Sequence, residues 1–498
     1  MRGGYQPTEW LGAGQTSIAS RLCVGKRWPG RNARTTVVGE QRKLNTDSLV
    51  RLGRSLALPG EPFGSAGALP TQGEHCGFAG VVTYRRDVDS ARRCAKAVAI
   101  LRTAFYVEPF LLICFGFLLR VSPPLLEGGA SPPLLIQSCV FFLCVVVMYC
   151  AYDTAMSWEH NCLRGPQFQG ADPIVPEVPL KQFLGLPVGS RFGIAAGLLP
   201  NSNWVLPYAR RGFDILTWKT VRSVARPCYP VPNWVIVDDG GHPDGPVTVV
   251  DRWTGDVQQL SAAVCFGMPS LAPEQWRADI RWTADQLLPG QLLIVSVVAS
   301  PQPDWSLAQT ADDFAVCAGW AAEAGAQVIE ANLSCPNVCS AEGAIFLDVA
   351  ATRQVVQAIR RAIGKVPLLL KVGLFPQQQL LSEFLQAVDG MANGVTLVNC
   401  VTREVLRADG QPVFGERYRR AGVIGRSIHQ PSVAAVRQVR QLISSYGLNL
   451  QVAAVGGVSS VDDAGDFFLA GADAVLCGSS PAYFPNLAVQ VKQRHPEW

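Results

Sequence analysis

Side chains that can do chemistry are crowded into one short stretch of the sequence, Val328-Ile-Glu-Ala-Asn-Leu-Ser-Cys-Pro-Asn337. The stretch begins as an apolar strand and then presents Asn332, Ser334, Cys335 and Asn337. Amide groups suit recognition of a planar, amide-rich ligand, and a thiol can serve as a base near neutral pH when its surroundings favour the thiolate. An asparagine cap beside a buried cysteine would give the same residues without any function. The helices and strands around this stretch are needed to distinguish a functional site from an ordinary capped turn.

Two lysines give a second signal, because Lys219 and Lys371 each end a buried apolar strand. An unpaired ammonium group is costly in such a place. Either a neighbouring carboxylate compensates each lysine, or each faces a ligand that becomes anionic. A phosphate-bearing cofactor whose ring gains negative charge on reduction would explain both lysines.

Glycine-rich turns end two further strands, at Val455-Gly-Gly-Val-Ser-Ser460 and at Cys477-Gly-Ser-Ser480. Such turns leave backbone N–H groups free at the start of the following helix, where an anion is favoured. Either turn alone could be an ordinary tight connection. As a neighbouring pair, they predict a phosphate cradle.

The elements that must position these groups share one pattern, in which a helical segment ends at a glycine and a short apolar strand follows. Gly212, Gly325, Gly390 and Gly471 mark four such units. Strands buried on both faces are typical of parallel sheets, and eight of them predict a closed (β/α)8 barrel over residues 175–498, with a doubly wound open sheet as the alternative. The active site of such a barrel lies at the carboxyl ends of the strands. The expected strands are Phe192–Ala195, Ile215–Lys219, Leu292–Ser296, Val328–Asn332, Leu368–Lys371, Val395–Asn399, Gln451–Val455 and Ala474–Ser479.

Three of these motifs together resemble the dihydroorotate dehydrogenase family: Glu330-Ala-Asn-Leu-Ser-Cys-Pro-Asn337, Leu397-Val-Asn399 and Ala454-Val-Gly-Gly-Val-Ser-Ser460. The similarity is greatest to the class 1 members, followed by the barrel of dihydropyrimidine dehydrogenase. It implies an FMN-binding barrel that oxidises a dihydropyrimidine, or reduces the pyrimidine in reverse. Cys335 would then be the base for the C5 proton of the substrate, while the flavin N5 takes the C6 hydride. A serine at this position would be typical of the quinone-linked class 2 enzymes.

The same resemblance implies roles for the other residues of the site. Asn332, Asn337 and Asn399 would bind the pyrimidine amides, Lys371 would stabilise reduced flavin, and Lys219 would act in catalysis beside flavin and substrate. The expected FMN-binding residues are Ala196, Gly197, Lys219, Thr220, Asn332, Lys371, Asn399, Gly425, Gly456, Gly457, Gly478 and Ser479. No metal ion is expected.

Several positions depart from the family pattern. Val264 and Ser270 stand where the family's Asn-Ser-Met-Gly-Leu-Pro-Asn segment has its two asparagines, so an amide that would bind the substrate is missing. Arg426 follows Gly425 where glycines are usual, and His429 lies close by. These changes leave FMN binding intact and leave open a related flavin enzyme with another substrate, or a ligand-binding barrel without activity.

The N-terminal part has a different composition. Residues 1–100 hold 15 Lys and Arg against 7 Asp and Glu and show no helical or strand period, which predicts either a basic targeting segment or a poorly ordered leader. Residues 105–160 predict a hydrophobic helical hairpin, whose second apolar run, 133–152, has the length of a membrane-spanning helix. A buried helical pair that caps the barrel is the alternative.

Composition also limits the partners and the location. The 15 cysteines are odd in number and form no Cys-x-x-Cys pair, which argues against a disulfide framework or an iron–sulfur site and favours a reducing compartment. The C-terminal part carries no basic stripe with interleaved aromatic residues, so nucleic acid is not expected as a partner. We expect a pyrimidine-like substrate, membrane association through residues 105–152 with the barrel in a reducing, cytoplasmic-type compartment, and a homodimer or an electron-transfer partner. A soluble cytoplasmic protein is the alternative.

Overall fold

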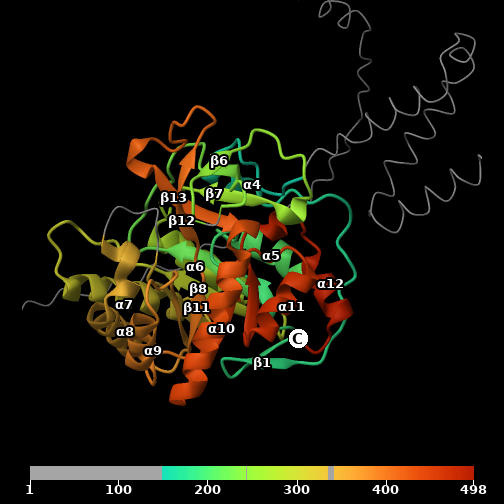
Figure 1. Ribbon diagram of the computed structural model, residues 1–498. Coiled ribbons are helices and arrows are strands. Elements are labelled where there is room, and N and C mark those ends of the chain that lie inside the picture. Colours follow the sequence, from blue (N-terminus) through green and yellow to red (C-terminus); the bar gives the residue numbers. More distant parts are fainter. Residues whose placement is uncertain (1–148, 243, 335–340) are drawn as a thin grey trace, which may run out of the picture. The chain divides into compact units, whose positions relative to one another are not determined.

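The computed structural model describes residues 149–242, 244–334 and 341–498 (Figure 1). The chain divides into two units, Met1–Leu125 and Leu126–Trp498, and all of the described residues belong to the second. The predicted leader and most of the predicted hairpin therefore lie outside the described residues. The described end of the hairpin forms no helix before α4 (Trp158–Arg164). Within the described part of the chain, none of the helices combines the length and the hydropathy of a membrane span.

The main body is a closed barrel of eight parallel strands, which confirms the predicted (β/α)8 fold and excludes the open sheet. Each strand lies hydrogen-bonded between two others, because parallel strands joined by helical crossovers can close on themselves when both faces are covered. All eight predicted strands are present with small differences at their ends. In order around the ring they are β3 (Phe192–Ile194), β4 (Ile215–Val221), β8 (Leu292–Val297), β9 (Val328–Asn332), β10 (Leu368–Lys371), β11 (Gly394–Leu397), β14 (Gln451–Val455) and β15 (Ala474–Cys477).

Local sequence signals set where the surrounding helices begin and end. Ser306 accepts a hydrogen bond from the Gln309 amide in a capping box, and Asp348 caps its helix through the Ala351 amide. The four glycines of the predicted pattern all have positive φ, from 74° at Gly390 to 109° at Gly325, a conformation that favours glycine. The helices are α5 (Ser202–Arg210), α6 (Pro273–Ala284), α7 (Leu307–Glu323), α8 (Val349–Ile363), α9 (Gln378–Val388), α10 (His429–Tyr446), α11 (Val461–Leu469) and α12 (Leu487–Arg494).

A short hairpin closes the amino-terminal end of the barrel. Its strands β1 (Lys181–Phe183) and β2 (Leu186–Val188) pair antiparallel, and β1 lies at the bottom of the view in Figure 1. Phe183 is fully buried in one cluster with Ile215, Val328 and other apolar side chains of the barrel strands. The lower half of the barrel is therefore packed with side chains, and any ligand must bind at the opposite end.

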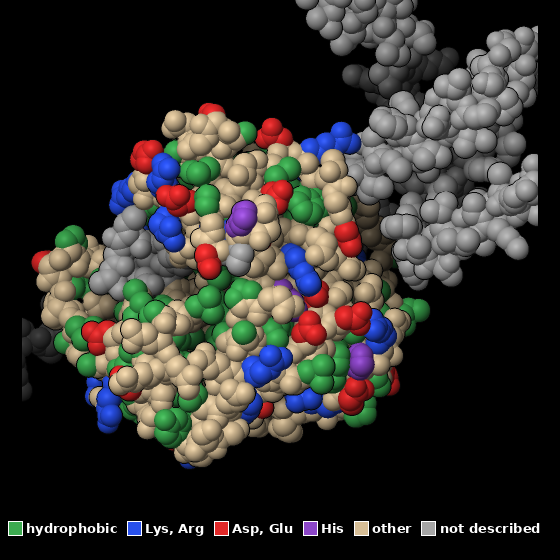
Figure 2. Space-filling view, in the orientation of Figure 1, with side chains coloured by type: hydrophobic (Ala, Val, Ile, Leu, Met, Phe, Trp, Pro, Cys, Tyr) green, Lys and Arg blue, Asp and Glu red, His purple; other side chains and the backbone are tan. Residues whose placement is uncertain are grey.

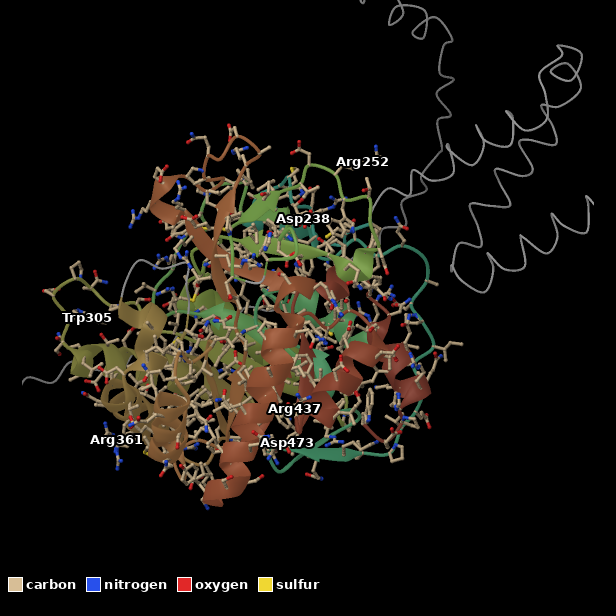
Figure 3. The ribbon with its side chains drawn as sticks, in the orientation of Figure 1. Asp238, Arg252, Trp305, Arg361, Arg437 and Asp473 are labelled. Carbon is tan, nitrogen blue, oxygen red and sulfur yellow. The ribbon has the colours of Figure 1, made fainter. Side chains whose placement is uncertain are left out.

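A second, smaller closed barrel lies at that opposite end, and the sequence did not predict it. Its five strands come from the two connections that follow β4 and β11, so they are far apart in the sequence. Figure 3 shows Asp238 of this small barrel and Asp473, which precedes β15, at opposite ends of the described part of the chain. The strands are β5 (Trp234–Asp238), β6 (Val247–Val249), β7 (Ser261–Val264), β12 (Val401–Leu406) and β13 (Arg420–Gly425).

The face seen in Figure 2 carries lysine and arginine side chains beside aspartates and glutamates, with no large area of one sign. Hydrophobic side chains gather between the small barrel above and the helices below. The distribution of charge on this face therefore does not indicate a functional region. The cavities described below do indicate one.

Because Phe183 fills the closed end of the barrel, we expect Phe183→Ala to lower the free energy of unfolding by about 3–5 kcal/mol. Chemical denaturation followed by tryptophan fluorescence measures this change. Leu469→Ala is the control, since Leu469 is 87% exposed and its truncation should change stability by less than ~0.5 kcal/mol. A loss below ~1 kcal/mol for Phe183→Ala would show that the plug does not support the barrel.

Candidate functional site

The carboxyl ends of the barrel strands surround a cavity of about 1000 Å³, counting the part open to solvent. The closed ring forces all eight ends to one rim, so residues far apart in the sequence meet there. Nine of the predicted residues line this rim cavity: Ala196, Gly197, Lys219, Thr220, Asn332, Lys371, Asn399, Gly478 and Ser479.

Asparagine side chains form the polar floor of the rim cavity. Asn332 Nδ2 donates to Thr220 Oγ1 at 3.2 Å, and Asn399 Nδ2 lies 3.3 Å from Asn332 Oδ1. Asn399 also donates to the backbone carbonyl of Ser334. The amides thus hold one another in place, which leaves a preorganised set of donors and acceptors facing the cavity.

Lys371 is almost completely buried, at 2% exposed, at the end of β10. Its Nζ donates to the carbonyl oxygen of Ala196 at 3.2 Å, and no carboxylate of the described residues lies within 4.0 Å of it. The reading in which a neighbouring carboxylate compensates this lysine is therefore wrong for the described part of the chain. Lys219 lines the same cavity, and its Nζ lies 5.3 Å from the centre of the Phe266 ring. Two cations thus border a space that a ligand can fill.

A second cavity of about 500 Å³ adjoins the first, since both are lined by Asn399, Ile424, Gly478 and Ser479. It contains the remaining predicted glycines, Gly425, Gly456 and Gly457. We call it the glycine cavity. Its turns follow β13, β14 and β15, as the sequence predicted for the last two.

The glycines that line the two cavities differ in what a Cβ atom at each position would contact. A Cβ at Gly457, where φ is +64°, would lie 2.5 Å from the carbonyl oxygen of Gly425, so backbone packing requires glycine there. A Cβ at Gly197 or Gly478 would meet nothing within 4 Å. These two glycines therefore border open space, and a side chain there would fill the cavity.

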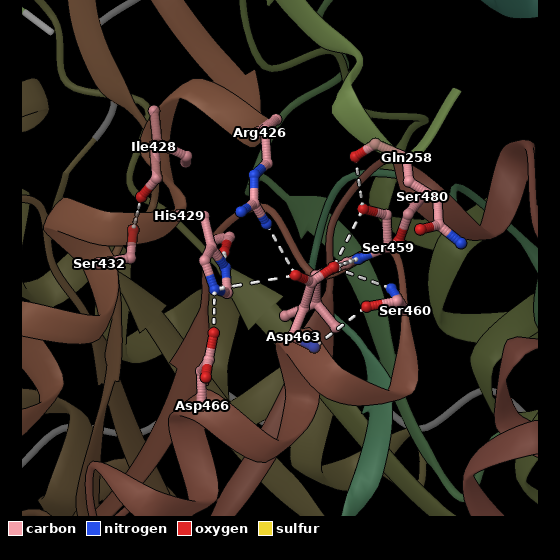
Figure 4. A network of polar contacts seen from close by, with 12 residues as sticks. Gln258, Arg426, Ile428, His429, Ser432, Ser459, Ser460, Asp463, Asp466 and Ser480 are labelled. Atoms are coloured by element: carbon pink, nitrogen blue, oxygen red, sulfur yellow. Dashed lines mark hydrogen bonds and ion pairs between the residues drawn. The ribbon is translucent and has the colours of Figure 1, made fainter. Parts of the chain in front are cut away.

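Figure 4 shows a polar network beside the glycine cavity that the sequence analysis noted only as a departure from the family. Arg426 Nη1 lies 2.7 Å from Asp463 Oδ1. His429 bridges the Gly456 carbonyl and Asp466, each at 3.0 Å from a ring nitrogen. The spacing of Ser460 and Asp463 is a capping-box signal, and it could have located the acid in advance.

Ligand atoms of His429, Asp463 and Asp466 lie within 4.8 Å of one another, close enough to hold a metal ion. Asp463 already accepts hydrogen bonds from the amides of Ser459 and Ser460, and it is paired with Arg426. Because these contacts compensate its charge, we do not assign a metal site to the cluster.

Aromatic side chains make up the outer wall of the rim cavity, and the sequence did not predict them. Tyr152 stacks on Trp234 with ring centres 5.2 Å apart, and Trp158 and Phe266 complete the wall. Burial raises the pKa of the Tyr152 hydroxyl above its ordinary value, so the group is a neutral donor. Tyr152 and Trp158 precede the first barrel strand, and the strand pattern gave no signal for them.

The two positions that depart from the family differ in their surroundings. Val264 lines the rim cavity and presents an apolar side chain to it. The Ser270 hydroxyl instead accepts a hydrogen bond from the Arg222 amide at 3.0 Å and donates to the Leu271 carbonyl. Cys335 and Asn337 lie outside the described residues.

Comparison with known proteins agrees with this arrangement. The family model described as dihydroorotate dehydrogenase matches residues 291–495. The dihydroorotate dehydrogenase of Dictyostelium discoideum is 29% identical over 358 residues, which cover 68% of this chain and 95% of that protein. The catalytic subunit of dihydroorotate dehydrogenase B (NAD(+)) from Solidesulfovibrio magneticus is 33% identical, over 38% of this chain and 59% of the relative.

The fold is also similar to that of a solved structure, the dihydroorotate dehydrogenase of Eimeria tenella in complex with ferulenol. The TM-score is 0.52 at 15% identity, and the match covers 74% of this chain and 92% of that one. At this identity the likeness concerns the fold alone. In sequence, the chain is similar to the dihydroorotate dehydrogenases, a family of oxidoreductases.

Proposed function

We propose that the chain is an FMN-dependent oxidoreductase that oxidises a dihydropyrimidine, with dihydroorotate as the first candidate. The observation that carries the proposal is Lys371, a buried ammonium group that borders the rim cavity without a carboxylate among the described residues. A buried cation in this state is costly unless a ligand compensates it. The relatives named above, which are dihydroorotate dehydrogenases, support the same reading.

The residues present fit an FMN molecule that spans both cavities. The rim cavity offers amides and cations to a flat heteroaromatic ring, while the glycine cavity offers backbone N–H groups to a phosphate. Gly197 and Gly478 border space that a Cβ would otherwise occupy. FMN, when bound, supplies the hydride acceptor. Ala196, Gly197, Thr220, Gly425, Gly456, Gly457, Gly478 and Ser479 would hold it.

The remaining chemistry falls to side chains of the chain itself. Asn332 and Asn399 would orient the amides of a pyrimidine, aided by Asn337. Lys371 would stabilise negative charge on the ring, and Lys219, which lines the rim cavity, would act beside flavin and substrate. Cys335 would take the C5 proton, since a thiolate near neutral pH is a competent base.

A different substrate is the second candidate, and Val264 favours it. Ile424 and the aromatic wall line the same cavity as Val264. A ligand less polar than dihydroorotate would therefore lose fewer hydrogen bonds to water when it binds there. A related flavin enzyme with such a substrate would use the same floor of amides and lysines.

Membrane association through residues 105–152, with the barrel in a reducing compartment, is a further proposal that rests on their apolar composition. Residues 149–152 contact the main barrel, where the Ala151 amide donates to the Ala482 carbonyl at 2.7 Å. A chain that lacks residues 1–148 therefore keeps this contact. If it sediments with membranes as the full chain does, the proposal is wrong.

If Lys371 stabilises reduced flavin, Lys371→Met should lower the midpoint potential of the bound flavin by about 30–60 mV, equivalent to ~1.4–2.8 kcal/mol. Redox titration of the visible absorbance measures it. Lys365→Met is the control, because Lys365 is exposed and precedes the other end of β10. A wild-type protein that stays colourless after FMN is added would contradict the proposed function itself.

Replacement of the proposed base, Cys335→Ser, should reduce turnover of the dihydropyrimidine by about 10²–10⁴-fold, because a hydroxyl is a poorer base than a thiolate. The FMN content should not change. Cys400→Ser is the control, since Cys400 lines the rim cavity and has no assigned role. Unchanged turnover in Cys335→Ser would point to another base.

The variant Val264→Asn, which adds the missing amide, distinguishes dihydroorotate from a less polar substrate. If the apolar residue selects against dihydroorotate, kcat/KM for dihydroorotate should rise by about 5–10-fold, the effect of one added hydrogen bond. Ser270→Asn should give no such gain, because Ser270 does not line the cavity. Efficient wild-type turnover of dihydroorotate that falls in Val264→Asn would reject the second candidate.

A further inference from the structure

The glycine cavity has a single charged side chain among the described residues that line it, and that side chain is Arg426. Arg426 begins the short helix η5 (Arg426–Ile428), directly after Gly425 at the end of β13. Its side chain is 33% exposed, so part of the guanidinium remains accessible. In Figure 4 it points toward Asp463, a residue of α11.

Asp463 fixes one edge of this guanidinium. Its Oδ1 lies 2.7 Å from Arg426 Nη1, while its Oδ2 accepts hydrogen bonds from the amides of Ser459 and Ser460, each at 2.9 Å. A carboxylate held by two amides at the start of a helix cannot turn away. Arg426 therefore uses one nitrogen on Asp463 and keeps its other N–H groups for a second acceptor.

The backbone behind the cavity is held in place by the same cluster. His429 is fully buried and joins the Gly456 carbonyl to Asp466. A Cβ on Gly456 would lie 2.2 Å from Ser432 Oγ, so the turn sits directly on α10. The cavity wall is thus rigid on the side from which Arg426 projects.

Without Arg426, the negative charge of Asp463 would make the glycine cavity unfavourable for an anion. Asp463 borders the cavity region through its contact with Ser459, a lining residue, and its negative charge would repel a phosphate. A guanidinium placed between the two can neutralise the carboxylate and donate to a phosphate at once, because its N–H groups fan out in one plane.

We propose that Arg426 is a phosphate-binding side chain of this protein, positioned by Asp463, and that it adds a charged donor to the backbone amides of the glycine cavity. The inference rests on the proposed function, since it takes FMN as the ligand. The chemical class recognised is a phosphate monoester on a flavin. Asp463 is the positioning residue.

The test compares two probes that differ only in the phosphate, FMN and riboflavin. The full-length chain, freed of bound flavin, is titrated with each probe, and quenching of flavin fluorescence gives the Kd. Arg426→Ala should weaken FMN binding by about 10–100-fold, as expected for loss of hydrogen bonds between two charged groups, and leave riboflavin binding within ~2-fold. Arg426→Lys should fall between wild type and Arg426→Ala.

Arg440→Ala is the matched control. Arg440 is 28% exposed and pairs with Asp473, yet it lines neither the rim cavity nor the glycine cavity. It should leave both Kd values unchanged. The double variant Arg426→Ala/Asp463→Asn, which also removes the repelling carboxylate, should recover part of the FMN affinity lost in Arg426→Ala, and full recovery to the wild-type Kd would overturn the direct contact.

Other results of the two titrations would overturn either the role of Arg426 or the proposed function. An Arg426→Ala protein that binds FMN as tightly as wild type, or that loses FMN and riboflavin affinity equally, would overturn the inference and leave the proposed function standing. A wild-type chain that binds neither probe would instead reject the proposed function, and the inference with it.

Discussion

Closure of the eight-stranded ring is the constraint on which the rest of the molecule depends. Once β3 pairs with β15, every strand must end at the same rim, and the register fixes which ends are neighbours. Lys371 lies beside Asn332 on one side and Thr396 on the other because β10 pairs with both β9 and β11. The position of Lys371 on the rim is therefore fixed by the backbone hydrogen bonds of the ring, which do not depend on a ligand. Hydrophobic packing around Phe183 at the other end of the barrel stabilises the fold and offsets the cost of burying the Lys371 ammonium group.

Much of this scaffold could be predicted because its signals are local. Gly212, Gly325, Gly390 and Gly471 each end a helix and precede a strand, and the left-handed backbone at these glycines can be inferred from the residues themselves. The rim residues followed from the strand ends once a barrel was inferred. Ala196, Lys219, Lys371 and the glycines of the turns therefore needed no long-range information.

The five-stranded barrel could not be predicted in the same way, because its pairings are not local. Ser261 on β7 pairs with Gly425 on β13, more than 150 residues along the chain, and β6 has only 3 residues. Short strands with distant partners leave no periodic pattern to recognise. The roles of Tyr152 and Trp158 in the cavity wall were hidden for the same reason, since a segment before the barrel folds back over its rim.

Under the proposed function, the small barrel would let cofactor binding and substrate selection vary independently. Successive residues of β13 border different spaces, since Gly425 lines the glycine cavity alone whereas Ile424 lines both cavities. Val264 ends β7, which pairs with β13, and it faces the rim cavity only. A substitution at Val264 therefore changes the lining of the rim cavity and leaves the lining of the glycine cavity as it is. Arg426 follows β13 directly and does the reverse. The amides and lysines of the rim belong to the main barrel, so under the proposed function its chemistry would stay constant while the inserted barrel changes which ligand fits.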